Sequence, residues 1–258
     1  MTHAIPELLP MLIHIAFGFP LALSAFMLLT IDLFTELPPA ISLAYEPPES
    51  DIMSKPPRNP KKDRIASPQL LTYVYLQAGL IESFFGFLGF FLVFDFYGLS
   101  FSKLFNTPYF QESDDPPMPT FPGCHSYEHF TSRPVGSVCY TAAEQKEVLW
   151  QAQTCYYALV VMAQVFHVWL CKTRKESIFT HGLFRNEFTF PAVVTELCLL
   201  FLFIFPPSSK DVILTIPFPP KFWGLLVLAP FTLFVLQEGR KWWVRKHPNG
   251  FVATHINW

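Results

Sequence analysis

Two acidic residues, Asp32 and Glu36, interrupt an apolar stretch and are the residues whose type and spacing most suggest chemistry. They lie four positions apart, so a helix would place both on one face. A carboxylate at membrane depth is costly and normally faces a partner, a cavity or an ion. Pro38 and Pro39 follow after one residue and would release backbone carbonyls from helical hydrogen bonding. The pattern favours a cation site inside a bilayer, and the alternative is that the two acids only end a helix near the headgroups.

The composition indicates a membrane protein. Of the 258 residues, 51% are hydrophobic and only 15% are charged, which leaves too little polar surface to cover a soluble domain. The net charge of -2 argues against a nucleic-acid partner. No basic segment precedes an apolar one at the start, so no cleavable signal peptide is expected. The five cysteines lack the spacing of a zinc site, although Cys124 and Cys139 share a polar segment and could pair if it is extracellular.

The elements that would position the two acids are apolar segments, and the first of them has two interpretations. It is either one span with the acids just past its end, or two helices separated by a turn at Gly18-Phe19-Pro20. Glycine and proline together favour the turn, which puts the acids near the middle of a helix over Leu21–Tyr45. The fold class predicted is an all-α polytopic transmembrane bundle. Its six spans are expected at about 6–18, 21–45, 70–97, 150–171, 187–205 and 220–239, with an outer loop at 98–145.

Basic residues predict the orientation of these spans. They concentrate in 46–68, in 172–187 and in the tail after 239, so the positive-inside rule places these three segments in the cytoplasm. Six spans then put both chain ends inside, whereas five spans would put the first residue outside. The basic residues of 172–175 and 240–246 are expected to contact anionic lipid headgroups.

Several segments closely resemble the alpha subunits of sodium/potassium- and proton/potassium-transporting P-type ATPases. The matching segments are Ile5–Glu7, Ile31–Glu36, Pro39–Glu46, Glu49–Met53, Pro57–Pro60, Cys171–Lys175 and Glu238–Pro248. The resemblance covers nearly the whole chain except the loop at 98–145. It implies the C-terminal membrane half of such a pump, which in that family is the fifth to the tenth of ten helices.

The resemblance also implies which residues bind the transported ion. Asp32, Thr35 and Glu36 match family ligands of the sixth helix, although the sodium/potassium pump has aspartate at both acidic positions. Glu7 matches the glutamate that coordinates the ion where the fifth helix unwinds, and its alternative role is a helix cap. Gln164 is a further family ligand. Sodium or potassium is therefore expected at Glu7, Asp32 and Glu36.

Three other polar residues depart from the family pattern. His167 stands where the sodium/potassium pump has an aspartate attributed to its third sodium site, which puts that site in doubt. Glu196 falls about one position from another family acid, and Glu82 replaces a frequent glutamine. Each is a candidate for a third site or an ion pathway, and the alternative for His167 and Glu82 is a structural contact between helices.

The catalytic motifs of the family are missing from this sequence. Neither the phosphorylation motif DKTGT nor a glycine-rich phosphate loop occurs, so ATP and magnesium are expected only in a separate catalytic half. We therefore expect a truncated product, a partial gene model or one piece of a split pump in the plasma membrane, with no cofactor of its own. Expected partners are the N-terminal catalytic half, a beta subunit at the outer loop, and lipids. The alternatives are half of a proton/potassium exchanger and a non-catalytic membrane interaction protein.

Overall fold

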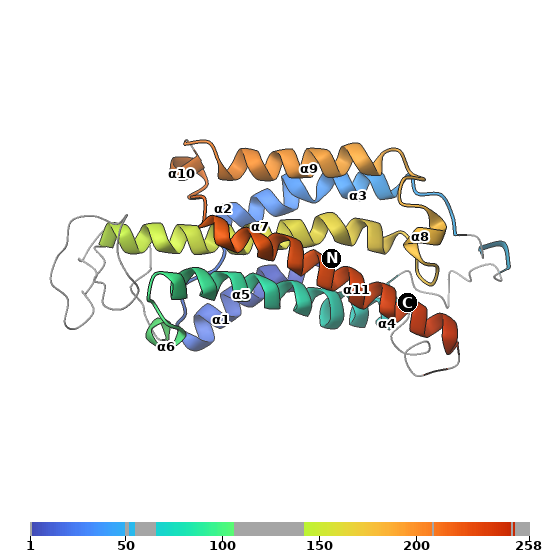
Figure 1. Ribbon diagram of the computed structural model, residues 1–258, viewed down its shortest axis with the longest axis horizontal. Coiled ribbons are helices and arrows are strands. Elements are labelled where there is room, and N and C mark those ends of the chain that lie inside the picture. Colours follow the sequence, from blue (N-terminus) through green and yellow to red (C-terminus); the bar gives the residue numbers. More distant parts are fainter. Residues whose placement is uncertain are drawn as a thin grey trace.

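The computed structural model describes residues 2–49, 52–54, 66–105, 142–207, 209–248 and 250. Regular structure in this part of the chain is helical, and the longer helices lie side by side along one axis (Figure 1). This agrees with the predicted all-α class. Most of the expected outer loop, including Cys124 and Cys139, lies outside the described residues, as do 57–60.

The turn predicted inside the first apolar segment is confirmed. Helix α1 (Ala4–Phe17) ends at Gly18, whose φ of 65° is a left-handed conformation that glycine adopts without strain. The next helix begins later than predicted, at Ala25 instead of residue 21. The reason is local: Ser24 is the N-cap, and its hydroxyl accepts a hydrogen bond of 3.2 Å from the Met27 amide.

Two of the long helical segments contain a stretch of π-helix. The first runs through α2 (Ala25–Thr30), the π-helix η1 (Ile31–Thr35) and α3 (Leu37–Leu43). The second runs through α4 (Pro68–Thr72), η3 (Tyr73–Gly79) and α5 (Leu80–Phe96). Such stretches are rare and are often found at functional sites. The first of them contains Asp32, one of the two acids singled out in the sequence.

The remaining helices complete the bundle. They are η2 (Ile52–Ser54), α6 (Phe101–Leu104), α7 (Ala142–Cys171), α8 (Ile178–His181), α9 (Thr189–Ile204), α10 (Ser209–Val212), η5 (Pro220–Phe222) and α11 (Trp223–Lys246). Two helices extend beyond the predicted spans: α7 begins before residue 150, and α11 continues past 239. Both extensions are rich in charged or amide residues with good helix propensity, which hydropathy alone leaves outside a span.

Four helical segments of the described chain are long and apolar enough to cross a membrane. They are Ala25–Leu43, Pro68–Phe96, Glu144–Cys171 and Pro220–Lys246. Helices α1 and α9 are apolar but shorter, so the expected count of six spans stays a prediction. Helix α7 runs through the middle of the bundle, with α9 and α2–α3 on one side and α5 on the other (Figure 1). Its residues from Val148 to Val161 supply much of the buried core.

Three of the basic residues expected to contact lipid headgroups are instead buried. The Lys172 ammonium lies 3.2 Å from a Glu46 carboxylate oxygen. The Lys241 ammonium donates to the Leu170 carbonyl, the Thr173 hydroxyl and the Glu238 carboxylate at 3.0–3.1 Å. Arg240 is 7% exposed. The expectation was wrong for these three because each has a partner inside the protein, whereas Arg174, Lys175, Arg245 and Lys246 are exposed.

Candidate cation site

The structure brings together the three acids predicted to bind the ion. Glu7 comes from α1, Asp32 from η1, and Glu36 from the residue between η1 and α3. Ligand atoms of Glu7, Asp32 and His3 all lie within 4.8 Å of one another. The His3 ring bridges the two acids of the second helix, with Nδ1 2.7 Å from Glu36 Oε1 and Nε2 3.6 Å from Asp32 Oδ1. Two separate helices therefore contribute charge to one small volume.

His3 was not singled out from the sequence. The available signal was its spacing, because it precedes Glu7 by four residues and a helical turn places such a pair on one face. The Glu7 amide does donate to the His3 carbonyl at 3.0 Å, which closes that turn. Sodium and potassium prefer oxygen ligands, so a search for their ligands in the sequence passes over a histidine. The His3 ring nevertheless adds two nitrogen atoms beside the acidic candidate ligands.

Prolines loosen the backbone next to the acids. An α-helix would supply the Phe34 and Thr35 carbonyls with hydrogen bonds from the residues four positions later, but those residues are Pro38 and Pro39, which lack an N–H. The π-type turn changes the pattern further, since the Glu36 amide donates five residues back to the Ile31 carbonyl at 3.0 Å. Carbonyl oxygens near Asp32 and Glu36 are thereby released from the regular ladder and become possible ligands.

Thr35 lies at this loosened turn but is engaged with the backbone. Its side chain is fully buried, and its hydroxyl donates to the Ile31 carbonyl at 3.1 Å. A hydroxyl oxygen that donates its proton still has lone pairs for an ion. The structure therefore leaves Thr35 chemically able to be a ligand, although it does not line the neighbouring cavity.

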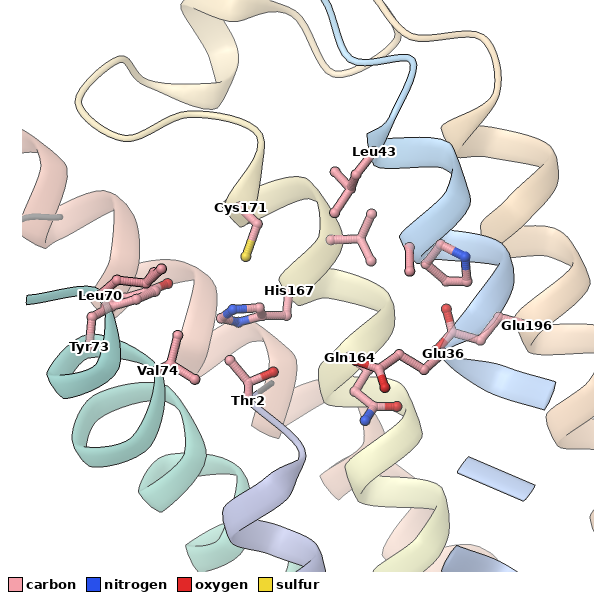
Figure 2. Close-up of a pocket in the computed structure, with 13 residues that line it drawn as sticks. Thr2, Glu36, Leu43, Leu70, Tyr73, Val74, Gln164, His167, Cys171 and Glu196 are labelled. Carbon is pink, nitrogen blue, oxygen red and sulfur yellow. The ribbon is translucent and has the colours of Figure 1, made fainter. Parts of the chain in front are cut away.

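A cavity of about 290 Å³ extends from Glu36 into the bundle. Its polar lining residues include Glu36, Gln164, His167 and Glu196, contributed by the second helix, α7 and α9. Figure 2 shows Gln164 and Glu196 close to Glu36, while His167 points across the cavity toward Tyr73. Three more of the predicted residues thus share one space with a primary candidate ligand.

Polar atoms around this cavity are buried without a hydrogen-bond partner among the described residues. They are both amide atoms of Gln164, both carboxylate oxygens of Glu196 and both ring nitrogens of His167, together with Oε1 of Glu7 nearby. Each buried polar atom left unpaired costs about 1–3 kcal/mol. Clusters of such atoms in a native protein indicate a site for water or an ion.

Glu82 lies behind His167, outside the cavity lining. Both of its carboxylate oxygens are buried without a hydrogen bond among the described residues, and Oε1 is 3.8 Å from His167 Nδ1. The His167 ring also stacks on Tyr73 with centroids 6.2 Å apart. The pair therefore forms a contact between α5 and α7, the structural alternative expected for both residues, and their role in a third site or an ion pathway stays a prediction.

Known proteins resemble this chain over almost its whole length. Residues 20–243 match the family model described as "Cation transporting ATPase, C-terminus". The potassium-transporting ATPase alpha chain 1 of Xenopus laevis is 35% identical over 97% of this chain and 23% of its own length. The sodium/potassium-transporting ATPase subunit alpha-B of Artemia franciscana is 31% identical over 98% of this chain and 24% of its own length.

A third relative has a similar sequence identity and a similar coverage. The sodium/potassium-transporting ATPase subunit alpha-3 of Gallus gallus is 30% identical over 98% of this chain and 24% of its own length. The chain thus spans about a quarter of the length of these curated relatives. The resemblance predicted from the sequence is confirmed: this chain belongs to the family of C-terminal domains of cation-transporting ATPases.

Proposed function

We propose that this chain is the cation-binding membrane half of a sodium/potassium-exchanging P-type ATPase alpha subunit. The observation that carries the proposal is the convergence of Glu7, Asp32 and Glu36 from two helices beside a polar cavity. Sodium and potassium are hard cations that prefer oxygen ligands, and carboxylates and loosened carbonyls provide them at a break in a membrane helix.

Each ligand has a distinct role in this proposal. The negative charges of Glu7, Asp32 and Glu36 offset the cost of removing water from the ion in a low-dielectric site. The Thr35 hydroxyl and the backbone carbonyls of Phe34 and Thr35 supply neutral oxygen ligands. Gln164 and Glu196, beside Glu36 in the cavity, hold a second ion position or a step of the pathway, with His167 and Glu82 farther along.

In this proposal, the hydrolysis of ATP is carried out by other parts of the pump. Relatives of this chain are named as transporting ATPases, and hydrolysis of ATP with magnesium belongs to a catalytic half that this sequence does not contain. We place the domain in the plasma membrane with six spans, adding α1 and α9 to the four long segments. The 14 residues of α1 extend about 21 Å, so α1 would need flanking residues to cross a core of about 30 Å. The beta subunit is assigned to the loop at 98–145.

Cation-dependent stability of the purified chain in lipid nanodiscs tests the ion site directly. An ion that binds the folded state raises the melting temperature, so potassium or sodium chloride should stabilise the protein relative to choline chloride. Asp32→Asn and Glu36→Gln should each weaken the apparent affinity about tenfold to a hundredfold, the equivalent of about 1–3 kcal/mol. Glu187→Gln is the matched control, because Glu187 is exposed. Full cation stabilisation in both site variants would refute the assignment.

A proton/potassium exchanger is the second candidate, and the position of His3 favours it. An imidazole 2.7 Å from Glu36 places a side chain that can carry a proton directly against a candidate ligand. The two candidates differ in the ion that drives phosphorylation in the assembled pump. With the catalytic half present, sodium-stimulated phosphate incorporation supports the first candidate, whereas potassium-stimulated turnover without any sodium requirement supports the second.

A further inference from the structure

His167 and Cys171 share one face of α7. They lie four positions apart, so one turn of the helix places their side chains next to each other. Both line the cavity of about 290 Å³ that extends from Glu36, and Figure 2 shows both side chains reaching into it from α7. The cavity therefore offers imidazole nitrogens and a thiol sulfur side by side, whereas the cation site described above uses no sulfur.

The His167 ring has unused ligand atoms although it is buried. The residue is 5% exposed, and neither ring nitrogen has a hydrogen-bond partner among the described residues. Buried polar atoms in native proteins normally have a partner, so two unpaired nitrogens on one ring need an explanation. Stacking on Tyr73, with ring centroids 6.2 Å apart, holds the ring in place. A fixed ring with unpaired nitrogens at a cavity indicates a place for a ligand.

Glu82 lies on the other side of this ring. Its Oε1 is 3.8 Å from His167 Nδ1, which is longer than a hydrogen bond, and a small rotation of the ring would close the gap. Histidines that bind metal ions almost always donate their other ring N–H to a group such as a carboxylate, which fixes the tautomer. A proton on Nδ1 facing Glu82 would leave the lone pair of Nε2 for a metal ion. Glu82 is therefore a positioning residue in this arrangement.

The Cys171 thiol is more accessible than that of Cys155 on the same helix. Cys171 is the last residue of α7 and is partly exposed, whereas Cys155 is buried. The positive-inside rule assigns this end of α7 to the cytoplasm, where thiols stay reduced. The sulfur is thus available as a ligand at the end of the helix from which a cytoplasmic ion would arrive.

The charges around the pair do not exclude a cation. Lys241 and Arg240 on α11 act on His167 electrostatically, but the Lys241 ammonium is 3.1 Å from a Glu238 carboxylate oxygen that balances its charge. Opposite them are Glu82 and Glu196, whose carboxylate oxygens are buried without a hydrogen bond in the part of the chain that the structure describes. Two acids therefore face the one guanidinium that no carboxylate balances among these residues.

We propose that His167 and Cys171 bind one zinc ion in this cavity, through an imidazole nitrogen and the thiolate sulfur, with the thiol proton released to water. Nitrogen and sulfur are ligands that select zinc over sodium, potassium and magnesium, which prefer oxygen. Zinc binds four ligands, so water in the cavity would occupy the remaining positions. This site takes a different class of ion from the alkali-cation site, and it does not depend on the proposed transport function.

Zinc transfer from a chromogenic chelator to the full chain in phosphatidylcholine nanodiscs tests the proposal. The unaltered protein should take up one zinc ion more than Cys171→Ser, and excess magnesium should not displace it. Cys198→Ser is the matched control, because it removes an exposed thiol on α9 and should leave the uptake unchanged. Glu82→Gln should weaken the zinc affinity about tenfold to a hundredfold through the orientation of the ring, whereas the exposed Glu187→Gln should not.

Protection of thiols against N-ethylmaleimide locates the bound ion. Mass spectrometry should show that zinc prevents the labelling of Cys171 but not that of Cys198, and that His167→Asn loses this protection while it keeps the thiol. Equal zinc uptake by the unaltered protein and by Cys171→Ser overturns the proposal. Protection of Cys171 that survives in His167→Asn also overturns it, even if Cys171→Ser fails to fold, because the ion would then be held without the imidazole.

Discussion

The hydroxyl of Tyr156 donates a hydrogen bond of 2.8 Å to the carbonyl oxygen of Pro6. In an α-helix this carbonyl would accept from the residue four positions later, but that residue is Pro10, which has no N–H. Tyr156 on α7 thus supplies the donor that α1 lacks. Because Glu7 follows Pro6 directly, the central helix of the bundle sets the position of a candidate ligand through this bond.

Tyr156→Phe should therefore reduce stability by about 1–3 kcal/mol, because it leaves a buried carbonyl unpaired. Reversible unfolding in mixed micelles measures the change. Tyr45→Phe is the control, since Tyr45 is 60% exposed and its stacking on Phe188 needs only the ring. Similar losses of stability in the two variants would show that the hydrogen bond from the Tyr156 hydroxyl does not stabilise the fold.

The close contact of α5 with α7 depends on Gly86. A methyl group there would lie 2.8 Å from the Tyr156 ring, which is too large and too constrained to move aside easily. Gly86→Ala should cost about 1–3 kcal/mol through overpacking. Gly89→Ala should cost less, because its closest contact, at 2.3 Å, is the end of the flexible Leu159 side chain.

Gly224→Ala serves as the control for both glycine variants. It meets nothing within 4 Å and gains helix propensity, so it should stabilise α11 slightly. The same unfolding measurement ranks the three proteins. A Gly86→Ala protein as stable as Gly224→Ala would contradict the proposed contact.

The pair of His167 and Glu82 predicts a cation-dependent variant. His167→Asp would put a second carboxylate beside Glu82 in a site where both side chains are at most 6% exposed. Like charges this close destabilise the folded protein unless a cation lies between them. The melting temperature of His167→Asp should fall in choline chloride and recover in sodium chloride, whereas His167→Asn should show no such recovery. If the melting temperature of His167→Asp were the same in choline chloride and in sodium chloride, this would argue against an ion position between residues 82 and 167.

Glu46 connects three segments at the predicted cytoplasmic end. Its carboxylate contacts the ammonium of Lys172 at 3.2 Å, the ring of His181 at 3.0 Å and the amide of Asn186 at 2.9 Å. Glu46→Ala leaves a buried ammonium without its anion and should cost about 3–5 kcal/mol. Glu46→Leu combined with Lys172→Met should recover most of this loss, because no charge then remains buried without its partner. If Glu46→Ala were as stable as Glu187→Ala, a control at an exposed residue, this account would be contradicted.

The sequence predicted some of these features because their physical cause is local. The cost of a carboxylate among apolar residues singled out Asp32 and Glu36, and the glycine and proline of residues 18–20 marked the turn. The cavity shared by Glu36, Gln164 and Glu196 was not predictable in the same way, since it depends on how three separate helices pack. The resemblance to known pumps pointed to these residues, but it carried no information on distances.

Burial of basic residues was the main failure of sequence reasoning. A lysine just after an apolar segment has the same local pattern whether it contacts a headgroup or an acid inside the protein. Lys172 is paired with Glu46, which lies far away along the chain, and Lys241 with the carbonyl of Leu170 on another helix. Only the packing of helix ends decides between the two, and neither hydropathy nor charge counting contains that information.

The segment from Ala25 to Leu43 is held at both ends by other segments of the bundle, through the hydrogen bond from Gln153 to the Leu21 carbonyl just before it and through the hydrogen bond from Asn186 to the Ser42 carbonyl. Between these anchors lies the π-helical turn of residues 31–35, which accommodates one more residue than an α-helical turn. Moving that surplus residue one position along the segment would rotate the side chains it passes by about 100° while both anchors stay in place. Asp32 and Glu36 would then face a different side of the bundle, while the helix as a whole stays in place. Such a local shift of the π-helical turn needs no movement of the two ends of the segment.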